Sequence, residues 1–234
     1  MLKKPPLLKT SLLNSLSPDN PRNRLYDEAI NASQKGEFDN LNKRFRFYFL
    51  TQLVTKAVAA APHLDLVECG CWRGHSSFVI SSIMRKAGCT GKLLIFDSFE
   101  GLSPFTDSDL SSFKSTPADR DKARRYFASN IAHVKSLLAP FGTAELKKGW
   151  IPEVFANHIP RELSFASIDV DLYEPTRAAI EFLYPQLRPG GIMFFDDYGY
   201  LDFPGAKKAI DEFLGKTKPS FFLEDPIGSA FLIK

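Results

Sequence analysis

The sequence predicts an α/β fold with a mostly parallel, seven-stranded sheet, helices on both faces and a C-terminal antiparallel hairpin. Short apolar runs alternate with segments of helical periodicity from residue 64 to residue 215, which is the pattern of parallel strands joined by crossover helices. The last two apolar runs, at 220–224 and 229–233, are separated only by the turn sequence DPIG and are expected to pair as a hairpin. With 234 residues, 44% of them apolar, the chain can bury one sizeable core.

Composition narrows the classes of function. The formal net charge of +3 is too weak to indicate a nucleic-acid partner. No apolar run approaches the ~18 residues of a membrane-spanning helix, and Lys9, Thr10 and Asn14 interrupt the N-terminal leucines, which argues against a signal peptide. The odd count of three cysteines favours free thiols in a reducing compartment. We therefore expect a cytoplasmic protein with no nucleic-acid partner and no membrane partner.

The first 61 residues are expected to form an N-terminal arm and a helical cap. Residues 1–20 are polar and contain several prolines, which is typical of a flexible arm. From residue 21 to about 61 the pattern is helical, with apolar residues such as Phe45, Phe49 and Leu53 at helical spacing before Pro62 ends it. The chain is thus divided into a cap of residues 1–61 and a domain of residues 62–234. The aromatic segment 44–61 could cover a second copy or its own sheet, so the sequence leaves a homodimer open.

The alternation of strands and helices begins after Pro62. Strands are expected at 64–68, 92–96, 144–148, 163–168 and 192–195, and helices at 75–88, 121–142, 174–187 and 204–215. Residues 98–119 are polar with scattered prolines and are expected to form a mobile loop, and the Pro-Gly-Gly at 189–191 is expected to form a turn. Five such units closed by an antiparallel pair are also the topology of Rossmann-like methyltransferases, which is an analogy of fold alone.

A glycine turn follows the first strand and opens the first crossover helix. Its spacing, Glu68-x-Gly70-x-x-x-Gly74, differs from the GxGxxG pattern of dinucleotide sites. An acid before the first glycine suits a ligand with a cationic end, and S-adenosylmethionine has an ammonium, a sulfonium and no phosphate. Asp97 ends the second strand, where an acid can accept the hydroxyls of a ribose. A plain strand-to-helix turn is the alternative, but the four residues in consecutive units favour binding.

Two pairs of aspartates end the fourth and fifth strands. Asp169 and Asp171 follow one strand, and Asp196 and Asp197 follow the next. Neighbouring parallel strands finish at the same edge of the sheet, so these carboxylates are expected to gather and to repel one another. Oxygen ligands favour a hard cation, Mg²⁺ first, with Ca²⁺ or Mn²⁺ as alternatives. The other interpretation is that some of these aspartates cap the following helices.

At this point the sequence resembles a known family, the macrocin-type O-methyltransferases, which methylate sugars of macrolide and aminocoumarin antibiotics. The resemblance runs from about residue 64 to 214, through LVECGCWRGHSS, FDSFEGL, KKGW, GAKKAIDEF and the long segment SIDVDLYEPTRAAIEFLYPQLRPGGIMFFDDYG. It implies a Rossmann-like class I methyltransferase fold, S-adenosylmethionine as the methyl donor and Mg²⁺ as a cofactor. The chain departs from the family pattern after KKGW, where Ile151-Pro152-Glu153 stands in place of the usual Phe and acid.

The resemblance also implies roles for individual residues. It assigns metal binding to Asp169, Asp196 and Asp197, and removal of the acceptor proton to Asp171, although the two aspartates of the D-x-D segment could exchange roles. The residues that it implies for the cofactor are Glu68, Gly70, Trp72, Gly74, Ser76, Asp97, Ser98, Phe99, Gly149, Trp150 and Asp169.

The expected function is therefore S-adenosylmethionine- and Mg²⁺-dependent methyl transfer to a hydroxyl of a small molecule, with a sugar or another vicinal diol as the acceptor. A catechol or phenol O-methyltransferase is one alternative, and a cofactor-binding protein of the same fold without catalysis is another. An NAD-linked oxidoreductase is disfavoured because GxGxxG is absent from the first turn. The cap and the segment 103–121, which would shape the acceptor pocket, match no pattern that identifies the acceptor.

Overall fold

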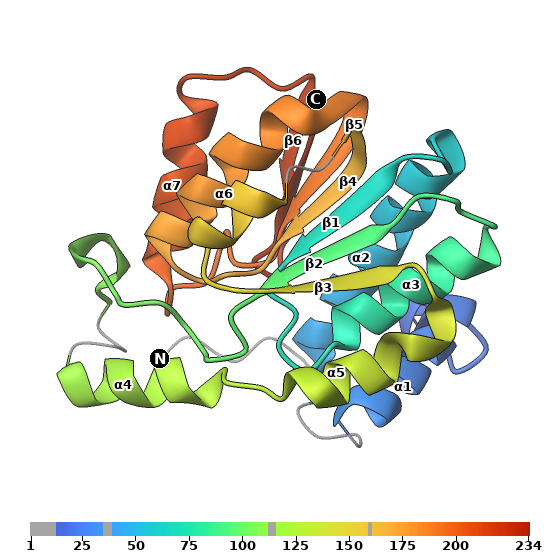
Figure 1. Ribbon diagram of the computed structural model, residues 1–234, viewed down its shortest axis with the longest axis horizontal. Coiled ribbons are helices and arrows are strands. Elements are labelled where there is room, and N and C mark those ends of the chain that lie inside the picture. Colours follow the sequence, from blue (N-terminus) through green and yellow to red (C-terminus); the bar gives the residue numbers. More distant parts are fainter. Residues whose placement is uncertain (1–12, 35–38, 112–115, 159–160) are drawn as a thin grey trace.

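The sheet has the predicted composition of five parallel strands and a C-terminal antiparallel pair. The computed structural model describes residues 13–34, 39–111, 116–158 and 161–234. Its strands lie in the order β3-β2-β1-β4-β5-β7-β6 (Figure 1). The strands are β1 (Asp65–Cys69), β2 (Leu93–Asp97), β3 (Ala144–Lys148), β4 (Leu163–Ile168), β5 (Leu187–Phe195), β6 (Phe221–Glu224) and β7 (Ala230–Ile233). β7 pairs antiparallel with both β5 and β6, which confirms the predicted hairpin.

Helices cover both faces of the sheet (Figure 1). One face carries α1 (Pro21–Gln34), α2 (Leu41–Ala60), α3 (His75–Lys86) and α5 (Ile131–Leu138), and the other carries α6 (Tyr173–Gln186) and α7 (Pro204–Leu214). α4 (Pro117–Tyr126) is joined to the loop after β2, because Leu102 donates its N–H to the carbonyl of Arg124. Short 3-10 turns occur at Asn14–Leu16, Asp107–Asp109, Ala139–Phe141 and Glu153–Asn157. None of the helices in the described residues is long and apolar enough to cross a membrane.

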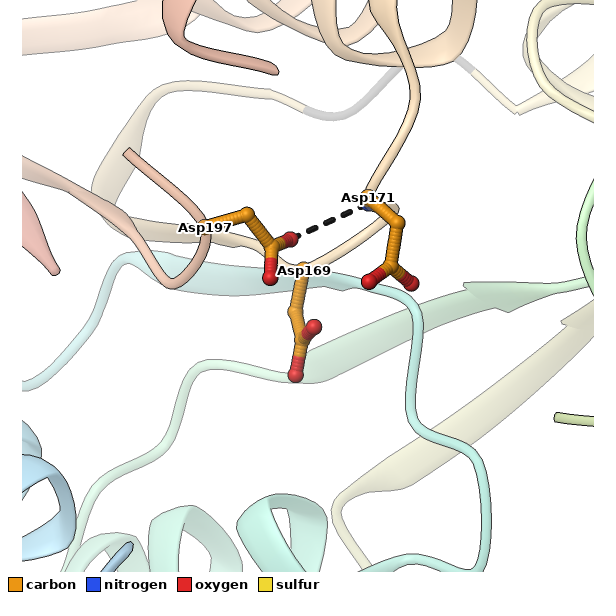
Figure 2. A group of neighbouring side chains, drawn as sticks. All are labelled: Asp169, Asp171 and Asp197. Carbon is orange, nitrogen blue, oxygen red and sulfur yellow. Dashed lines mark hydrogen bonds between the residues drawn. The ribbon is translucent and has the colours of Figure 1, made fainter. Parts of the chain in front are cut away.

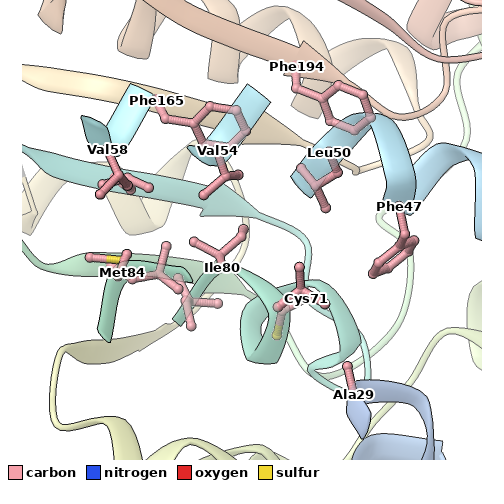
Figure 3. Packing of buried hydrophobic residues seen from close by; sticks show 14 of the residues in the cluster. Ala29, Phe47, Leu50, Val54, Val58, Cys71, Ile80, Met84, Phe165 and Phe194 are labelled. Atoms are coloured by element: carbon pink, nitrogen blue, oxygen red, sulfur yellow. The ribbon is translucent and has the colours of Figure 1, made fainter. Parts of the chain in front are cut away.

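The apolar core lies in two clusters, one on each face of the sheet. On the first face, Leu50 and Val54 of α2 belong to the same cluster as Phe165 of β4 and Phe194 of β5 (Figure 3). Residues of the expected cap and of the expected domain therefore share one core, and the boundary expected at residue 61 falls just after α2 ends. This packing fixes where the first turns of α2 lie relative to the ends of the strands.

The parallel strands are aligned so that they finish together. Cys69 is paired with Phe96 on one side and with Ile168 on the other, and Ile168 is paired with Phe195. The residue that follows β1, β4 or β5 donates its N–H to one of the last two carbonyls of a neighbouring strand, at 2.8 Å for Gly70, 2.9 Å for Asp169 and 3.0 Å for Asp196. The strand-end residues therefore stand in a row at one edge of the sheet, as the sequence predicts.

Two expected helices are each divided in the structure. The segment 21–61 forms α1 and α2, and Asn40 caps α2 by accepting a hydrogen bond from the N–H of Lys43 at 2.9 Å. The segment 121–142 forms α4 and α5 and the 3-10 turn at Ala139–Phe141, with Asn130 accepting hydrogen bonds from Ala132 and His133 at the start of α5. In the second case apolar spacing continues across the break, from Phe127 to Ile131 and Val134. In both cases an asparagine provides the local signal for a new helix start.

The prediction of a turn at 189–191 is wrong, because these residues lie within β5. They form an irregularity there: Leu187 pairs with Leu163, but Ile192 pairs with Phe165. The N–H of Gly190 donates a hydrogen bond to the carbonyl of Lys234, the residue after β7, so the irregular part of β5 is still paired with its neighbour. Of the expected mobile loop 98–119, residues 112–115 lie outside the described residues, and so do residues 1–12 of the expected arm.

Candidate active site

A cavity of about 310 Å³ opens at the edge where the parallel strands finish. Most of the residues singled out from the sequence line it: Gly70, Trp72, Ser76, Asp97, Ser98, Gly149, Trp150, Asp169, Asp171, Asp196 and Asp197. Glu68, Gly74 and Phe99 are not among the lining residues. The cavity thus brings together the expected cofactor turn and the expected metal ligands, as the alignment of the strand ends requires.

The first turn passes very close to the end of β4. Gly70 has a φ of +81°, and a Cβ at this position would lie 1.8 Å from the carbonyl oxygen of Asp169. Only glycine fits both this conformation and this contact. Trp72, two residues on, also has a left-handed φ of +46°, so the turn is held in a conformation that most residues avoid. The backbone of this turn is therefore packed directly against the start of the D-x-D segment.

Asp97 holds two turns in place with its carboxylate. Its Oδ2 accepts hydrogen bonds from the N–H of Cys71 at 2.7 Å and of Trp72 at 3.0 Å, and its Oδ1 accepts one from Phe99 at 2.6 Å. Gly149, after β3, donates its N–H to the backbone carbonyl of Asp97 at 3.0 Å. Asp97 therefore organises the floor of the cavity as well as facing it.

Glu68 lies buried beneath the first turn. Ser77 of α3 donates a hydrogen bond to one carboxylate oxygen, while the other has no hydrogen-bond partner among the described residues. Burial raises the pKa of Glu68 to about 7, against the hydrogen bonds to Ser76 and Ser77, which lower it. Near neutral pH this side chain is divided between a carboxylate and an uncharged acid. The cofactor role expected for Glu68 remains a prediction.

Three carboxylates meet where β4 and β5 end (Figure 2). Asp169, Asp171 and Asp197 each offer an oxygen, and these atoms all lie within 4.8 Å of one another. The N–H of Asp171 donates a hydrogen bond to Oδ2 of Asp197 at 3.0 Å, and Asp171 has a left-handed φ of +60°. Strained backbone of this kind is common at functional sites, where the surrounding structure holds it in place.

Burial and mutual repulsion disfavour the charged forms of this acidic rim, by which we mean Asp169, Asp171, Asp196 and Asp197. The pKa values of Asp169 and Asp197 are raised well above their ordinary value, first by burial and then by the neighbouring carboxylates. Burial also raises the pKa of Asp196, but Arg46 and Lys43 oppose that shift. A set of buried carboxylate oxygens at this separation can hold a hard cation, which would remove the repulsion.

Sequence reasoning missed the two cations that α2 brings to the cavity. Nη1 of Arg46 lies 2.9 Å from Oδ2 of Asp196, and Lys43 also lines the cavity. Burial, and then repulsion by Arg46, lowers the pKa of Lys43 to about 8. The available signal in the sequence is the pair of basic residues, 43 and 46, beside the apolar stripe of the segment 44–61, but this spacing alone does not place them in the cavity.

An apolar wall of the cavity, consisting of Leu102, Phe127 and Phe203, was not predicted from the sequence. These three side chains line the cavity, and the rings of Phe127 and Phe203 meet edge to face with centroids 6.2 Å apart. Leu102 and Phe203 form a small buried cluster with Leu172, which directly follows Asp171. Leu102 lies in the expected loop 98–119, Phe127 in the expected helix 121–142 and Phe203 just before the expected helix 204–215, so the sequence pattern did not bring the three together.

Comparison with known proteins identifies the family. The family described as Macrocin-O-methyltransferase (TylF) matches residues 41–225. The 8-demethyl-8-(2,3-dimethoxy-alpha-L-rhamnosyl)-tetracenomycin-C 4'-O-methyltransferase of Streptomyces olivaceus is 30% identical over 172 residues, which cover 70% of this chain and 61% of that protein. The demethyldecarbamoylnovobiocin O-methyltransferase of Streptomyces niveus is 26% identical, over 65% of this chain and 58% of that protein. The chain thus spans about six tenths of the length of these relatives.

Solved structures show the same fold. The O-methyltransferase NovP superposes with a TM-score of 0.67 at 23% identity, covering 80% of this chain and 78% of its own. The calicheamicin methyltransferase CalS11 has a TM-score of 0.64 at 20% identity, covering 93% of both chains. These likenesses confirm the predicted class I methyltransferase fold. Since the family match includes α2, the whole parallel sheet and all four carboxylates of the acidic rim, the chain belongs to the macrocin O-methyltransferase family.

Proposed function

We propose that this chain is an S-adenosylmethionine- and Mg²⁺-dependent O-methyltransferase that acts on a hydroxyl of a small molecule, a sugar or another vicinal diol. One observation carries the proposal. Three carboxylate oxygens within 4.8 Å of one another, from Asp169, Asp171 and Asp197, face the same cavity as the glycine turn and Asp97. A cofactor subsite and a cation subsite are thus adjacent, which is what metal-assisted transfer between two small molecules needs.

The cofactor subsite is assigned to the turn after β1, the end of β2 and the loop after β3. Gly70 and Trp72 offer a closely approaching backbone, Asp97 and Ser98 offer polar side chains, and Trp150 offers an aromatic surface in the same cavity. Support comes from solved structures of the fold: the O-methyltransferase of Bacillus cereus, with a TM-score of 0.57 at 13% identity, is described as being in complex with SAH. Glu68, Gly74 and Phe99 would act from behind the lining residues.

The donor set of the acidic rim fits Mg²⁺, because every group is a carboxylate, and Asp171, Asp196 and Asp197 are buried while Asp169 is half-buried. We assign Asp169, Asp196 and Asp197 as the residues that hold the ion. A bound Mg²⁺ would lower the pKa of an acceptor hydroxyl and help to orient it.

The acceptor class follows from the relatives. Their printed names specify methylation of a rhamnosyl tetracenomycin, a novobiocin precursor and mycinamicin III, which is methylated at a 3''-hydroxyl. For this chain we propose a hydroxyl of a sugar carried by a larger molecule. The apolar wall of Leu102, Phe127 and Phe203 supports this class, because the C–H faces of a sugar pack well on aromatic rings.

Thermal melting with added ligands tests the cofactor, and methyl transfer in the presence or absence of EDTA tests the metal. S-adenosylmethionine and its demethylated product should each raise the melting temperature, and NAD should not. Labelled methyl transfer to glycosides and catechols, with MgCl₂ or with excess EDTA, then identifies the reaction. Transfer to glycosides that stops in EDTA is the expected result. Stabilisation by NAD alone, or full transfer in EDTA, would contradict the proposal, and transfer to catechols alone would move the acceptor to the alternative class.

Substituting Asp197→Asn removes one charge from the rim without changing the shape of the side chain. Methyl transfer should fall by more than about a hundredfold, since even an outer partner of a metal ligand is worth ~10–100-fold. Affinity for S-adenosylmethionine, measured by calorimetry, should change little. Asp121→Asn on α4 alters an exposed carboxylate and is the matched control, which should keep wild-type activity. Wild-type activity in Asp197→Asn would remove Asp197 from the proposed site.

A further inference from the structure

Arg46 reaches the acidic rim from a helix that is distant in sequence from every carboxylate there. Its Nη1 lies 2.9 Å from Oδ2 of Asp196 and 3.2 Å from the hydroxyl oxygen of Tyr200, and its guanidinium centre lies 5.6 Å from the centroid of the Tyr200 ring. The Arg46 side chain is 17% exposed and that of Asp196 is 10% exposed. Buried pairs of this kind are held firmly, because either partner left alone would be a charge without water.

The pair gives Asp196 a position different from that of the other aspartates. Among the described residues, the three that bring carboxylate oxygens within 4.8 Å of one another are Asp169, Asp171 and Asp197. Oδ2 of Asp196 is instead bonded to the guanidinium of Arg46. Asp196 is adjacent to Asp197 in the chain and lies at the same strand end, but its carboxylate is paired with Arg46.

The charges of the rim also indicate what Arg46 does. The four aspartates of the acidic rim face the cavity, and Lys43 and Arg46 of α2 supply two cationic side chains beside them. With all six groups ionised, two negative charges remain, which a single divalent ion would balance. Burial alone would lower the pKa of Arg46, but attraction to Asp196 and Asp169 raises it, so its charge is permanent. The guanidinium therefore competes with a divalent ion for the same carboxylate.

We propose that Arg46 sets the divalent-metal affinity of the active site by competing with the metal ion for the carboxylate of Asp196. This inference rests on the metal site of the proposed function and adds a residue outside the strand ends to it. Nε of Arg46 is buried and has no hydrogen-bond partner among the described residues, so the side chain is not fully satisfied where it lies. Release of Asp196 would leave the guanidinium next to Tyr200, whose hydroxyl already accepts a hydrogen bond from it.

Direct metal binding tests the proposal without a turnover assay. MgCl₂ is titrated calorimetrically, and MnCl₂ by the loss of its free-ion paramagnetic resonance signal, into wild type and Arg46→Met, whose unbranched stem fills much of the same space. Arg46→Met should bind both ions at least about tenfold more tightly, because a competing charge has been removed. Arg46→Lys keeps the charge and should stay within a few-fold of wild type. Thermal melts confirm that each variant is folded.

Two further variants isolate the cause. Arg44→Met removes a charge from the same helix, but Arg44 pairs with Asp27 and Asp39, so metal affinity should not change. In an Asp196→Asn background, Arg46→Met should no longer tighten binding, since the contested carboxylate is gone. Equal or weaker binding by Arg46→Met, or a gain that persists in the Asp196→Asn background, overturns the inference and leaves the proposed function standing. If neither wild type nor any variant binds either ion, both this inference and the metal site of the proposed function are overturned. Calorimetry with S-adenosylmethionine still reports on the cofactor subsite in that case.

Discussion

Two of the charged walls of the cavity have different origins, and they differ in how their residues are positioned. The strand-end wall consists of the turns after β1, β2, β4 and β5, and its backbone is held by hydrogen bonds between neighbouring strands. The α2 wall consists of Lys43, Arg46 and Phe47, which reach the cavity from a helix packed on the face of the sheet. The first wall is positioned by the topology of the sheet, and the second by side-chain packing alone. Both walls are charged, with opposite signs.

This difference explains how far the charges of each wall can adjust. Strand-end carboxylates cannot move apart without breaking the ladder, so their repulsion is expressed as raised pKa values of Asp169 and Asp197. Long cationic side chains on a helix can move at their ends while their stems stay packed. A rigid acidic wall and an adjustable basic wall together give the cavity a charge balance that bound ligands can change. Substitutions in one wall at a time test this difference.

The largest expected effect comes from disturbing the strand-end wall. Gly70→Ala would place a Cβ 1.8 Å from the carbonyl oxygen of Asp169, which is backbone and cannot move aside alone. We expect a loss of about 4 kcal/mol in the free energy of unfolding, measured by urea denaturation, or failure to fold. Gly88→Ala is the matched control, since Gly88 also has positive φ, +64°, but nothing lies within 4 Å of its Cβ position.

The control should cost only about 1 kcal/mol, because it carries the conformational penalty without the clash. Similar losses in the two variants would show that the contact between the first turn and β4 is soft. The strand-end wall would then be as adjustable as the α2 wall, and the comparison between them would fail.

The strand-end wall is also the part of the site that sequence predicts well. Gly70, Asp97, Asp169 and Asp196 each follow an apolar run directly, so recognising the strands is enough to place them on one edge of the sheet. Nothing in that reasoning depends on side-chain packing. The neighbouring positions of the fourth and fifth strands and the closing hairpin were also predicted, and the structure confirms both.

Residues of the α2 wall could not be placed in the same way. Arg46 lies 150 positions before Asp196, and their contact depends on how α2 crosses the sheet, which apolar periodicity does not specify. The break between α4 and α5 was missed for a related reason, since the apolar spacing of Phe127 and Ile131 continues through it and Asn130 marks the new helix start. Sequence patterns therefore located the acidic half of the site and left its basic counterpart unassigned.

A smaller change in the free energy of unfolding should follow from replacing Glu68, under the first turn, with a neutral residue. Its pKa in the folded protein is raised to about 7 from 4.5, so between these pH values the folded state holds more protons than the unfolded state. Wild-type stability should fall as pH rises through this window and remain low above it. Glu68→Gln lacks this loss and can still accept the hydrogen bond of Ser77.

We therefore expect Glu68→Gln to match wild type near pH 4.5 and to exceed it by about 2–3 kcal/mol at pH 7.5, in urea denaturation at each pH. Its affinity for S-adenosylmethionine should fall if Glu68 favours the cationic end of the cofactor. A variant that is less stable than wild type across the whole range would show that the carboxylate stabilises the turn, which is the opposite of what its burial indicates.

The smallest change in the free energy of unfolding is expected on the α2 wall, for substitution of Lys43. Burial lowers its pKa in the folded protein to about 8 from 10.5, so between these values the unfolded state holds more protons. Stability then rises with pH across this window. Lys43→Met should remove the rise, changing the difference in unfolding free energy between wild type and variant by about 1–2 kcal/mol from pH 8 to pH 10.

Urea denaturation in EDTA at several pH values measures this slope, and Lys56→Met, which alters an exposed lysine on the same helix, should keep the wild-type slope. The size of the change reports how far Lys43 is held from water. A slope unchanged by Lys43→Met would mean that its ammonium reaches solvent freely by swinging out of the cavity. Lys43 would then contribute little to the charge balance of the rim, and Arg46 alone would form the basic part of the α2 wall.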